Sequence, residues 1–209
     1  MDGVRSYKIH PGATPEAPGA ARHLAQVVDQ ARFQAYSPGQ FLTFASLPVP
    51  CTAVVIACFR EDSHILMLQP QGEAAPWDLP HGALPHGQEP ISYAGRLLCD
   101  LAGVTTAQPL SLYGAIDWGA TATAGGWGWT ACLFGGVAEI GTLPKTSWAA
   151  RRAFLPLGEA QARSPGDLWV HLRQQTLESA AAAFDTTRDY WLLQTLDAIS
   201  LNDLNDTLE

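Results

Sequence analysis

The chain has 209 residues, 47% of them hydrophobic, which is enough to bury the core of one domain and excludes global disorder. Its 20 acidic and 12 basic residues give a formal charge of −8, and a field of that sign repels nucleic acid. A small anionic ligand is not excluded, because a local pocket can oppose the global charge.

No segment has the pattern of a secretion signal or a membrane span. The first ten residues carry charges and lack the apolar stretch of a signal peptide. The longest uncharged run, Trp118 to Ala138, is rich in glycine and threonine, which is typical of a loop and a strand. We therefore expect no membrane partner. The four cysteines lack C-x-x-C spacing, so a thiolate zinc site is not expected, and we interpret them as reduced thiols of a cytoplasmic protein.

The N-terminal region, residues 1–40, is interpreted as an arm followed by a helix. Residues 1–19 are rich in Gly, Pro and Ala, which is typical of an irregular segment. From Ala20 to Tyr36 the apolar residues follow the helical period, at Leu24, Val27, Val28, Ala31 and Ala35. We expect this helix to lie on the domain and not inside a sheet.

Two strands and a helix come next along the chain. The run Thr52 to Phe59 is almost continuously apolar and β-branched, which predicts a buried central strand. After a turn, His64 to Leu68 is its hairpin partner. A loop from Pro80 to Glu89 precedes a helix over Pro90 to Ala102, where proline suits the first turn and Gly103 suits the C-terminal stop.

The remaining elements predict a mixed sheet between layers of helices. Strands are expected over Leu110–Trp118, Trp127–Ile140 and Phe154–Leu157, and helices over Gly166–Phe184 and Arg188–Leu201. We assign residues 41–165 to the core and 166–209 to a helical extension packed on it. An apolar stripe in the last helix, which includes Trp191 and Leu196, predicts packing on the sheet, with a homodimer interface as the alternative.

The segment from Trp77 to Val104, WDLPHGALPHGQEPISYAGRLLCDLAGV, resembles the Nudix box, G-x5-E-x7-R-E-U-x-E-E-x-G-U, where U is a bulky aliphatic residue. The matching residues are Trp77, Leu79, Pro80, Gly82, Arg96, Leu98, Gly103 and Val104. Arg151 to Ala160 is similar to the segment that closes such domains. The resemblance implies a Nudix-type α/β/α sandwich with a mixed sheet, which here carries an N-terminal helix and a C-terminal helix pair.

The chain departs from the Nudix box at the residues that carry its chemistry. Gln88 stands at the first glutamate, with Glu89 one place later. Leu97 stands at the glutamate after the arginine, and Asp100 and Leu101 stand at the glutamate pair. In the family these carboxylates bind magnesium, which bridges a diphosphate and activates water.

The lost carboxylates predict a weak metal site. Leu97 and Leu101 are four residues apart and share one helix face, which would be the metal face. Asp100 and Glu89 are the carboxylates left as candidate ligands, so we expect weak binding of magnesium or manganese, or none. Glu89 has an alternative role in starting the helix, because carboxylates stabilise its first turn. Arg96 is expected to tie the loop to the helix, and it is also a candidate partner for Glu89.

Two histidines flank the box loop. His81 and His86 are candidate acid–base groups or metal ligands if they face the ligand cleft, and solvent-exposed loop residues if they do not.

Aromatic residues and one aspartate are the candidate ligand-binding groups. Trp118, Trp127 and Trp129 would offer a stacking platform if they line the cleft, and would otherwise pack in the core or on the sheet. Trp77 is a further candidate for ligand binding. Asp117 ends its predicted strand and is a candidate polar contact, with a turn residue as the alternative.

Three functions from different classes fit this pattern. The first is an enzyme similar to Nudix hydrolases of diphosphate compounds, with Asp100 and Glu89 as a reduced metal site. The second is a metal-independent enzyme that uses His81 or His86. The third is a catalytically inactive module that binds a nucleotide-like ligand. We favour a small-molecule enzyme, and we expect no nucleic-acid partner because the C-terminal region is acidic.

Overall fold

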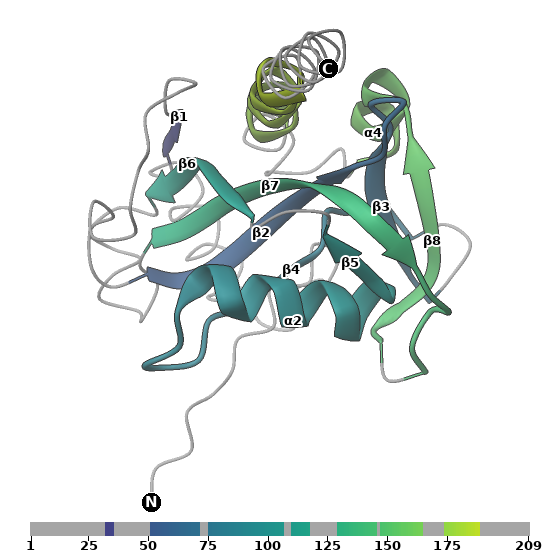
Figure 1. Cartoon of the computed structure of the whole chain (residues 1–209), viewed down its shortest axis with the longest axis horizontal. Helices are drawn as coiled ribbons and strands as arrows, with labels where there is room; N and C mark the ends of the chain where they lie inside the picture. Colours follow the sequence, from purple (N-terminus) through teal and green to yellow (C-terminus); the bar gives the residue numbers. More distant parts are fainter. Residues whose placement is uncertain are drawn as a thin grey trace, which may run out of the picture.

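The fold is an α/β/α sandwich around a mixed sheet (Figure 1). The computed structural model describes residues 32–35, 51–71, 75–106, 110–117, 129–145, 147–164 and 174–188. In these residues eight strands are joined, and the longest path across them runs β1-β6-β7-β2-β3-β8. β4 pairs with β2, and β5 pairs with β7.

The sheet is built around two long neighbouring strands. β2 (Cys51–Phe59) and β7 (Trp129–Ile140) run parallel, whereas the other pairings are antiparallel. The shorter strands are β1 (Arg32–Ala35), β3 (Ile65–Pro70), β4 (His81–Ala83), β5 (Val104–Thr106), β6 (Ser111–Asp117) and β8 (Ala149–Leu155). The prediction of a buried central strand over Thr52 to Phe59 is confirmed, since six of the nine β2 residues are buried, as expected for a strand covered on both faces.

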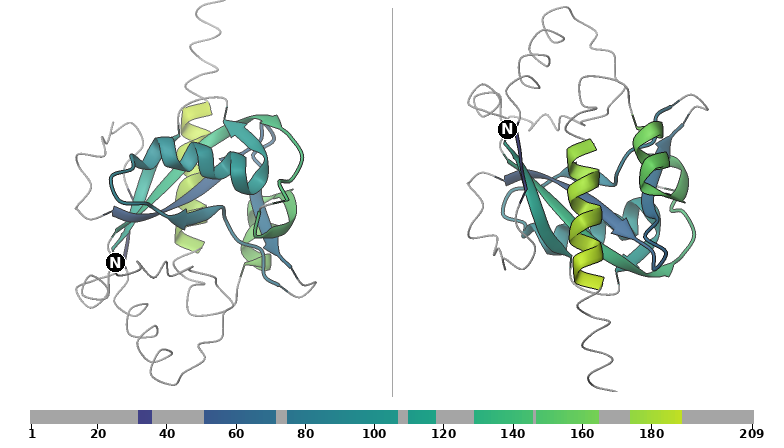
Figure 2. Two further views of the ribbon diagram at one scale, coloured as in Figure 1. Left: turned by 90° about the horizontal axis from the view of Figure 1, so that it is seen from below. Right: turned by 90° about the horizontal axis from the view of Figure 1, so that it is seen from above.

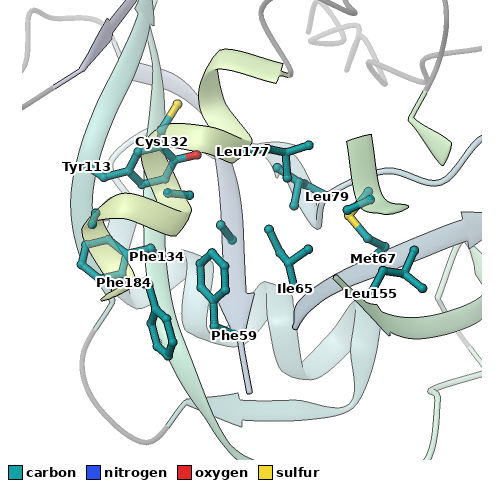
Figure 3. Packing of buried hydrophobic residues seen from close by; sticks show 14 of the residues in the cluster. Phe59, Ile65, Met67, Leu79, Tyr113, Cys132, Phe134, Leu155, Leu177 and Phe184 are labelled. Atoms are coloured by element: carbon teal, nitrogen blue, oxygen red, sulfur yellow. The ribbon is translucent and has the colours of Figure 1, made fainter. Parts of the chain in front are cut away.

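Helices cover both faces of the sheet (Figure 2). α2 (Pro90–Ala102) lies on one face, where Leu98 packs with Val54 and Ile56 of β2. α4 (Leu157–Arg163) and the helical segment 174–188 lie on the other face. There Phe59, Met67 and Leu177 belong to a second apolar cluster (Figure 3). The sheet is therefore buried from both sides.

The helical segment 174–188 is attached at the turn between β2 and β3. Phe184 stacks on Phe59 with ring centroids 4.5 Å apart and an interplanar angle of 15°. Next to this pair, Arg188 donates a hydrogen bond of 2.6 Å to the Ser63 hydroxyl and lies 3.3 Å from the Asp185 carboxylate. The segment 174–188 is thus packed on the sheet, whereas the division between a core of residues 41–165 and an extension of residues 166–209 stays a prediction.

The prediction of an N-terminal helix is wrong for residues 32–35, which form β1 at the edge of the sheet. Here Phe33 is half-buried between exposed Arg32 and Gln34, and its ring lies 6.2 Å from that of Tyr113. Pairing with β6 decides this conformation, because a strand gains its stability from neighbours that are distant in sequence. The rest of the predicted helix, from Ala20, lies outside the described residues.

Other boundaries also differ from the predictions. β8 begins at Ala149, five residues before the predicted strand, and α4 was not predicted. The helix predicted to end at Phe184 continues to Arg188, and the predicted last helix lies outside the described residues beyond that point. Across the part of the chain that the structure describes, no helix is long and apolar enough to cross a membrane.

Candidate functional site

The helix of the Nudix-like box begins and ends where its local sequence predicts. At its N-terminus the Glu89 carboxylate accepts hydrogen bonds from the backbone N–H groups of Ile91 (3.0 Å) and Ser92 (2.6 Å). Partial desolvation would raise the pKa of Glu89, but these two donors outweigh it and lower the pKa below its ordinary value. Pro90 occupies the first turn, where no intrahelical donor is needed. The helix-start role considered for Glu89 is confirmed.

At the C-terminus of α2, three residues satisfy the last carbonyl groups. Gly103 adopts the left-handed conformation (φ 61°), and its N–H donates to the carbonyl of Cys99. The Ser147 hydroxyl donates to the carbonyl of Leu101 at 2.6 Å, and the Arg152 guanidinium donates to the carbonyl of Ala102. These contacts fix α2 against the end of β7 and the start of β8.

The face of α2 that would carry metal ligands is apolar and packed. Leu101 is only 8% exposed and belongs to the core cluster on this side of the sheet, and Leu97 packs against that cluster. Gly82 of β4 approaches the same face so closely that a Cβ there would lie 2.9 Å from Leu97 Cδ2 and 3.2 Å from the Tyr93 hydroxyl oxygen. Leucine side chains and a glycine backbone fill the space between loop and helix in which a bound metal would be expected.

Arg96 ties the loop to the helix, as predicted. Its guanidinium donates to the Oε1 atom of Gln88 rather than to the carboxylate of Glu89. The alternative, in which Arg96 orients Glu89, is not what the geometry shows, because Glu89 uses both carboxylate oxygens on its own helix. The arginine of the box therefore keeps a structural contact although the acid at its partner position is an amide.

The two carboxylates expected to share a metal lie far apart. Glu89 precedes the first turn of α2 and Asp100 is exposed in its last turn. Eleven residues of helix separate them by about 16 Å along the axis, at about 1.5 Å per residue. Magnesium binds its oxygen ligands at about 2.1 Å, so one ion would not reach both. Among the residues that the structure describes, no group of three His, Cys, Asp or Glu side chains could hold a metal ion.

His81 is held at the start of β4 by two neighbours. Its Nδ1 atom lies 2.8 Å from the carbonyl oxygen of Leu79 and 3.7 Å from the Asp78 carboxylate. Since a carbonyl can only accept, Nδ1 carries the proton and Nε2 carries the lone pair. Asp78 is 2% exposed, whereas the His81 side chain keeps 18% of its surface exposed. The His81 ring lies 5.6 Å from that of Trp148, centroid to centroid.

The other candidate residues are not gathered around His81. His86 is exposed in the turn that follows β4. Trp77 packs with the core cluster on the α4 side of the sheet and lies 5.9 Å from the Arg163 guanidinium, whereas Trp129 packs on the α2 side. Asp117 pairs with Trp129 across β6 and β7. Trp118 and Trp127 lie outside the described residues, so the expected stacking platform stays a prediction.

Three residues near His81 were not among the sequence candidates. Asp78 belongs to the Trp-x-Leu-Pro approach, and an acid three residues before a histidine was the signal available for it. Tyr93 lies one helical turn before Leu97, so helical spacing places it on the same face. Trp148 comes from a segment 67 residues after His81, and no local pattern connects the two.

The buried cysteines are not reactive groups. Burial raises the pKa of the Cys58 thiol to about 12 and also raises that of Cys132. The two other thiols, of Cys51 and Cys99, are half-buried and exposed. Cys99 therefore differs from the buried thiols in lying on the outer surface of α2.

Known proteins were compared with the chain in sequence and in structure. No protein-family model matches it, and no curated protein matches it in sequence. In structure it is similar to the pyrophosphohydrolase BsRppH of Bacillus subtilis, with 13% identity and a TM-score of 0.51 over 72% of this chain and 92% of that one. A NUDIX hydrolase from Nitrosomonas europaea matches at 22% identity over 64% and 89% of the two chains (TM-score 0.48). The NUDIX domain of Shewanella oneidensis NrtR, complexed with ADP ribose, matches at 16% over 68% and 94% (TM-score 0.49).

Identities this low show a shared fold and leave activity undecided, because one fold hosts many functions. Three observations support one conclusion about the fold. They are the order of strands and helices, the box helix with its capped ends, and the match to BsRppH. This chain has the Nudix fold.

Proposed function

We propose that the chain is a small-molecule enzyme of the Nudix fold that works without a magnesium cluster and uses His81 to transfer a proton. The observation that carries this proposal is the contrast between two neighbouring places. The metal face of α2 is filled by Leu97 and Leu101, whereas His81 beside it is oriented and partly exposed.

The geometry of His81 suits a general base. Because Nδ1 donates to the Leu79 carbonyl, Nε2 has the lone pair that accepts a proton. The imidazolium formed in this way keeps its Nδ1–H towards that carbonyl and towards the buried Asp78 carboxylate at 3.7 Å.

A reduced metal site is the first alternative. It would depend on Asp100, which is exposed on α2, with water filling the other positions around the ion. Glu89 does not support it, because its carboxylate caps the helix.

A ligand-binding module without catalysis is the second alternative. The close packing of Gly82 against Leu97 supports this alternative, because a helix face packed in this way stabilises the fold and leaves less room for catalytic groups.

The first experiment is a calorimetric titration of magnesium and of manganese into the full chain, with and without ADP-ribose. We expect no saturable metal binding in either condition and no metal-dependent release of AMP. Saturable binding that disappears in Asp100→Asn would overturn the proposal in favour of the reduced hydrolase site.

A second experiment separates an enzyme from a binding module. Wild type and His81→Gln are incubated without metal with a panel of nucleosides and nucleoside derivatives, and both turnover and binding are measured. We expect turnover to disappear in His81→Gln while binding is retained. Ligands that bind without any turnover in wild type would overturn the catalytic role and favour the module.

A further inference from the structure

A cleft lies between the turn that joins β2 to β3 and the last residues of β7. Its volume is about 330 Å³, which is within the range of small-molecule sites. Three residues of the turn and three of β7 line it, namely Arg60, Glu61, Asp62, Val137, Ala138 and Ile140. No described residue of α2 and none of the candidate residues discussed above is among them.

The β7 side of the cleft is apolar because the strand is irregular there. Side chains of successive strand residues normally point to opposite faces of a sheet. The pairing of β7 with β5 skips Ala138, so β7 has one extra residue at this point. Val137 and Ala138 accordingly line the same cleft, together with Ile140. Of the large hydrophobic side chains described, only that of Ile140 is exposed, at 51%, so the bulge presents an apolar strip at the surface.

The charges on the opposite side of the cleft do not cancel. Arg60 donates hydrogen bonds of 3.2 and 2.6 Å to the Asp62 carboxylate, and its guanidinium lies 5.1 Å from the ring centroid of Phe154. The hydrogen bonds from Arg60 lower the pKa of Asp62, and His64 Nδ1 lies 3.0 Å from the same carboxylate. Glu61 is exposed, and its carboxylate makes no ion pair or hydrogen bond within the described part of the chain. One negative charge is therefore left without a partner.

The turn holds this charge at the rim of the cleft. The N–H group of Arg60 donates to the carbonyl of His64, and the N–H group of Ser63 donates to the carbonyl of Arg60, each at 3.0 Å. Ser63 adopts the left-handed conformation (φ 60°), and its hydroxyl accepts a hydrogen bond of 2.6 Å from Arg188. The backbone on both sides of Glu61 is thus fixed by hydrogen bonds.

We infer that this cleft binds a small organic cation in which an ammonium group is attached to an apolar chain. The ammonium group pairs with Glu61, and the chain packs on Val137 and Ile140. An anion is repelled by Glu61 and by the formal charge of −8, and an inorganic cation gains nothing from the apolar strip. The inference does not depend on the proposed function, because no residue of the cleft takes part in it.

The test uses NMR on the full chain with labelled isoleucine and valine methyl groups, in which Ile140→Thr assigns the Ile140 signal. The probes are n-butylammonium, its uncharged analogue n-butanol, its anionic analogue butyrate, and ammonium. We expect n-butylammonium to shift the Ile140 and Val137 signals saturably, with a midpoint about threefold lower than that of n-butanol, which is the gain that one exposed ion pair allows. Butyrate and ammonium should give no saturable shift.

A further probe distinguishes two sources of the same chemical group. An alkylammonium group can belong to a free amine or to a lysine side chain of another protein. Acetyl-lysine amide carries the group as a lysine side chain. Whichever of acetyl-lysine amide and n-butylammonium has the lower midpoint identifies the source, and saturation by either one supports the inference.

A matched pair of substitutions tests the charge. Glu61 and Glu139 are both exposed, but only Glu61 lines the cleft. Glu61→Gln should remove the preference for n-butylammonium over n-butanol, whereas the control Glu139→Gln should keep it. Ile140→Thr keeps a β-branched side chain on the strand and should raise the midpoints of both probes about threefold, because apolar contact is lost.

The wild-type titrations alone can overturn the inference. Equal midpoints for n-butylammonium and n-butanol would show that the charge plays no part, and equal midpoints for n-butylammonium and ammonium would show the same for the apolar strip. Shifts that rise linearly with every probe would show that no site exists. A preference that survives in Glu61→Gln would contradict the role given to Glu61. The three substituted side chains are exposed, so the variants are expected to fold.

Discussion

α2 and the helical segment 174–188 cover opposite faces of one sheet and are positioned by different kinds of contact. Both pack on the sheet through apolar side chains, and the ends of α2 are also set by local contacts, the Glu89 cap and the Gly103 stop. The segment 174–188 is fixed through its side, by the stack of Phe184 on Phe59 and by the contact of Arg188 with Ser63. The caps are contacts between neighbours in the sequence, whereas the stack joins residues that are far apart in the sequence.

The comparison shows which parts of the Nudix box serve the fold. Gly82, Arg96 and Gly103 make protein contacts that place α2. Leu97 and Leu101 join the apolar packing on the same face. The contacts that place α2 therefore do not need a carboxylate at residue 97 or 101.

The largest effect is expected from placing a carboxylate on the apolar face of α2. Leu101→Glu places a charge where only 8% of the side chain is exposed, and we expect a loss of about 4 kcal/mol in the free energy of unfolding. Leu97→Glu, at a half-buried position on the same face, should lose less. Urea denaturation of both variants gives the comparison, and equal stability of Leu101→Glu and wild type would contradict the packing role.

The opposite face is tested at the aromatic stack. Phe184→Ala removes the buried ring that stacks on Phe59, and we expect the free energy of unfolding to fall by about 3 kcal/mol. Phe184→Leu keeps most of the apolar volume and should lose less. The free energy of unfolding measures both, and a loss below that of an ordinary surface substitution would show that the segment is not part of the cooperative core.

The C-terminal stop of α2 is tested with a matched pair of glycines. At Gly103 a Cβ would meet the backbone carbonyl of Thr142, and residues with side chains rarely adopt this backbone conformation. Gly103→Ala should therefore lower the free energy of unfolding by about 2 kcal/mol. Gly95 lies inside the same helix with no atom near its Cβ position, and Gly95→Ala should stabilise by about 0.5 kcal/mol. Melting temperatures that move in the same direction for both would contradict this account of the stop.

The smallest effect is expected at the N-terminal cap, and it depends on pH. Glu89→Ala should cost about 1 kcal/mol near pH 7, where the carboxylate is charged. Because the pKa of Glu89 is lowered in the folded chain, its contribution is present above the ordinary value of about 4.5 and is lost as the pH falls through the lowered pKa. The free energies of unfolding of wild type and Glu89→Ala, measured at a series of pH values, should therefore converge in acid. A difference that stays constant with pH would exclude the carboxylate as the cause.

Local sequence determined much of the fold. The bounds of α2 could be predicted because proline, the acid before it and the final glycine act within a turn of the helix. β2 could be predicted because a continuous β-branched run suits a strand covered on both faces. The apolar face of α2 could also be predicted, because Leu97 and Leu101 are four residues apart and share one side of the helix.

The tertiary structure alone decided the contacts between distant segments. Residues 32–35 form a strand because they pair with β6, although their sequence has a helical period. The setting of His81 depends on Trp148, which the chain brings back at the start of β8, and on the burial of Asp78 beneath it. Such contacts follow from how the sheet is assembled, so the spacing of residues along the chain does not contain them.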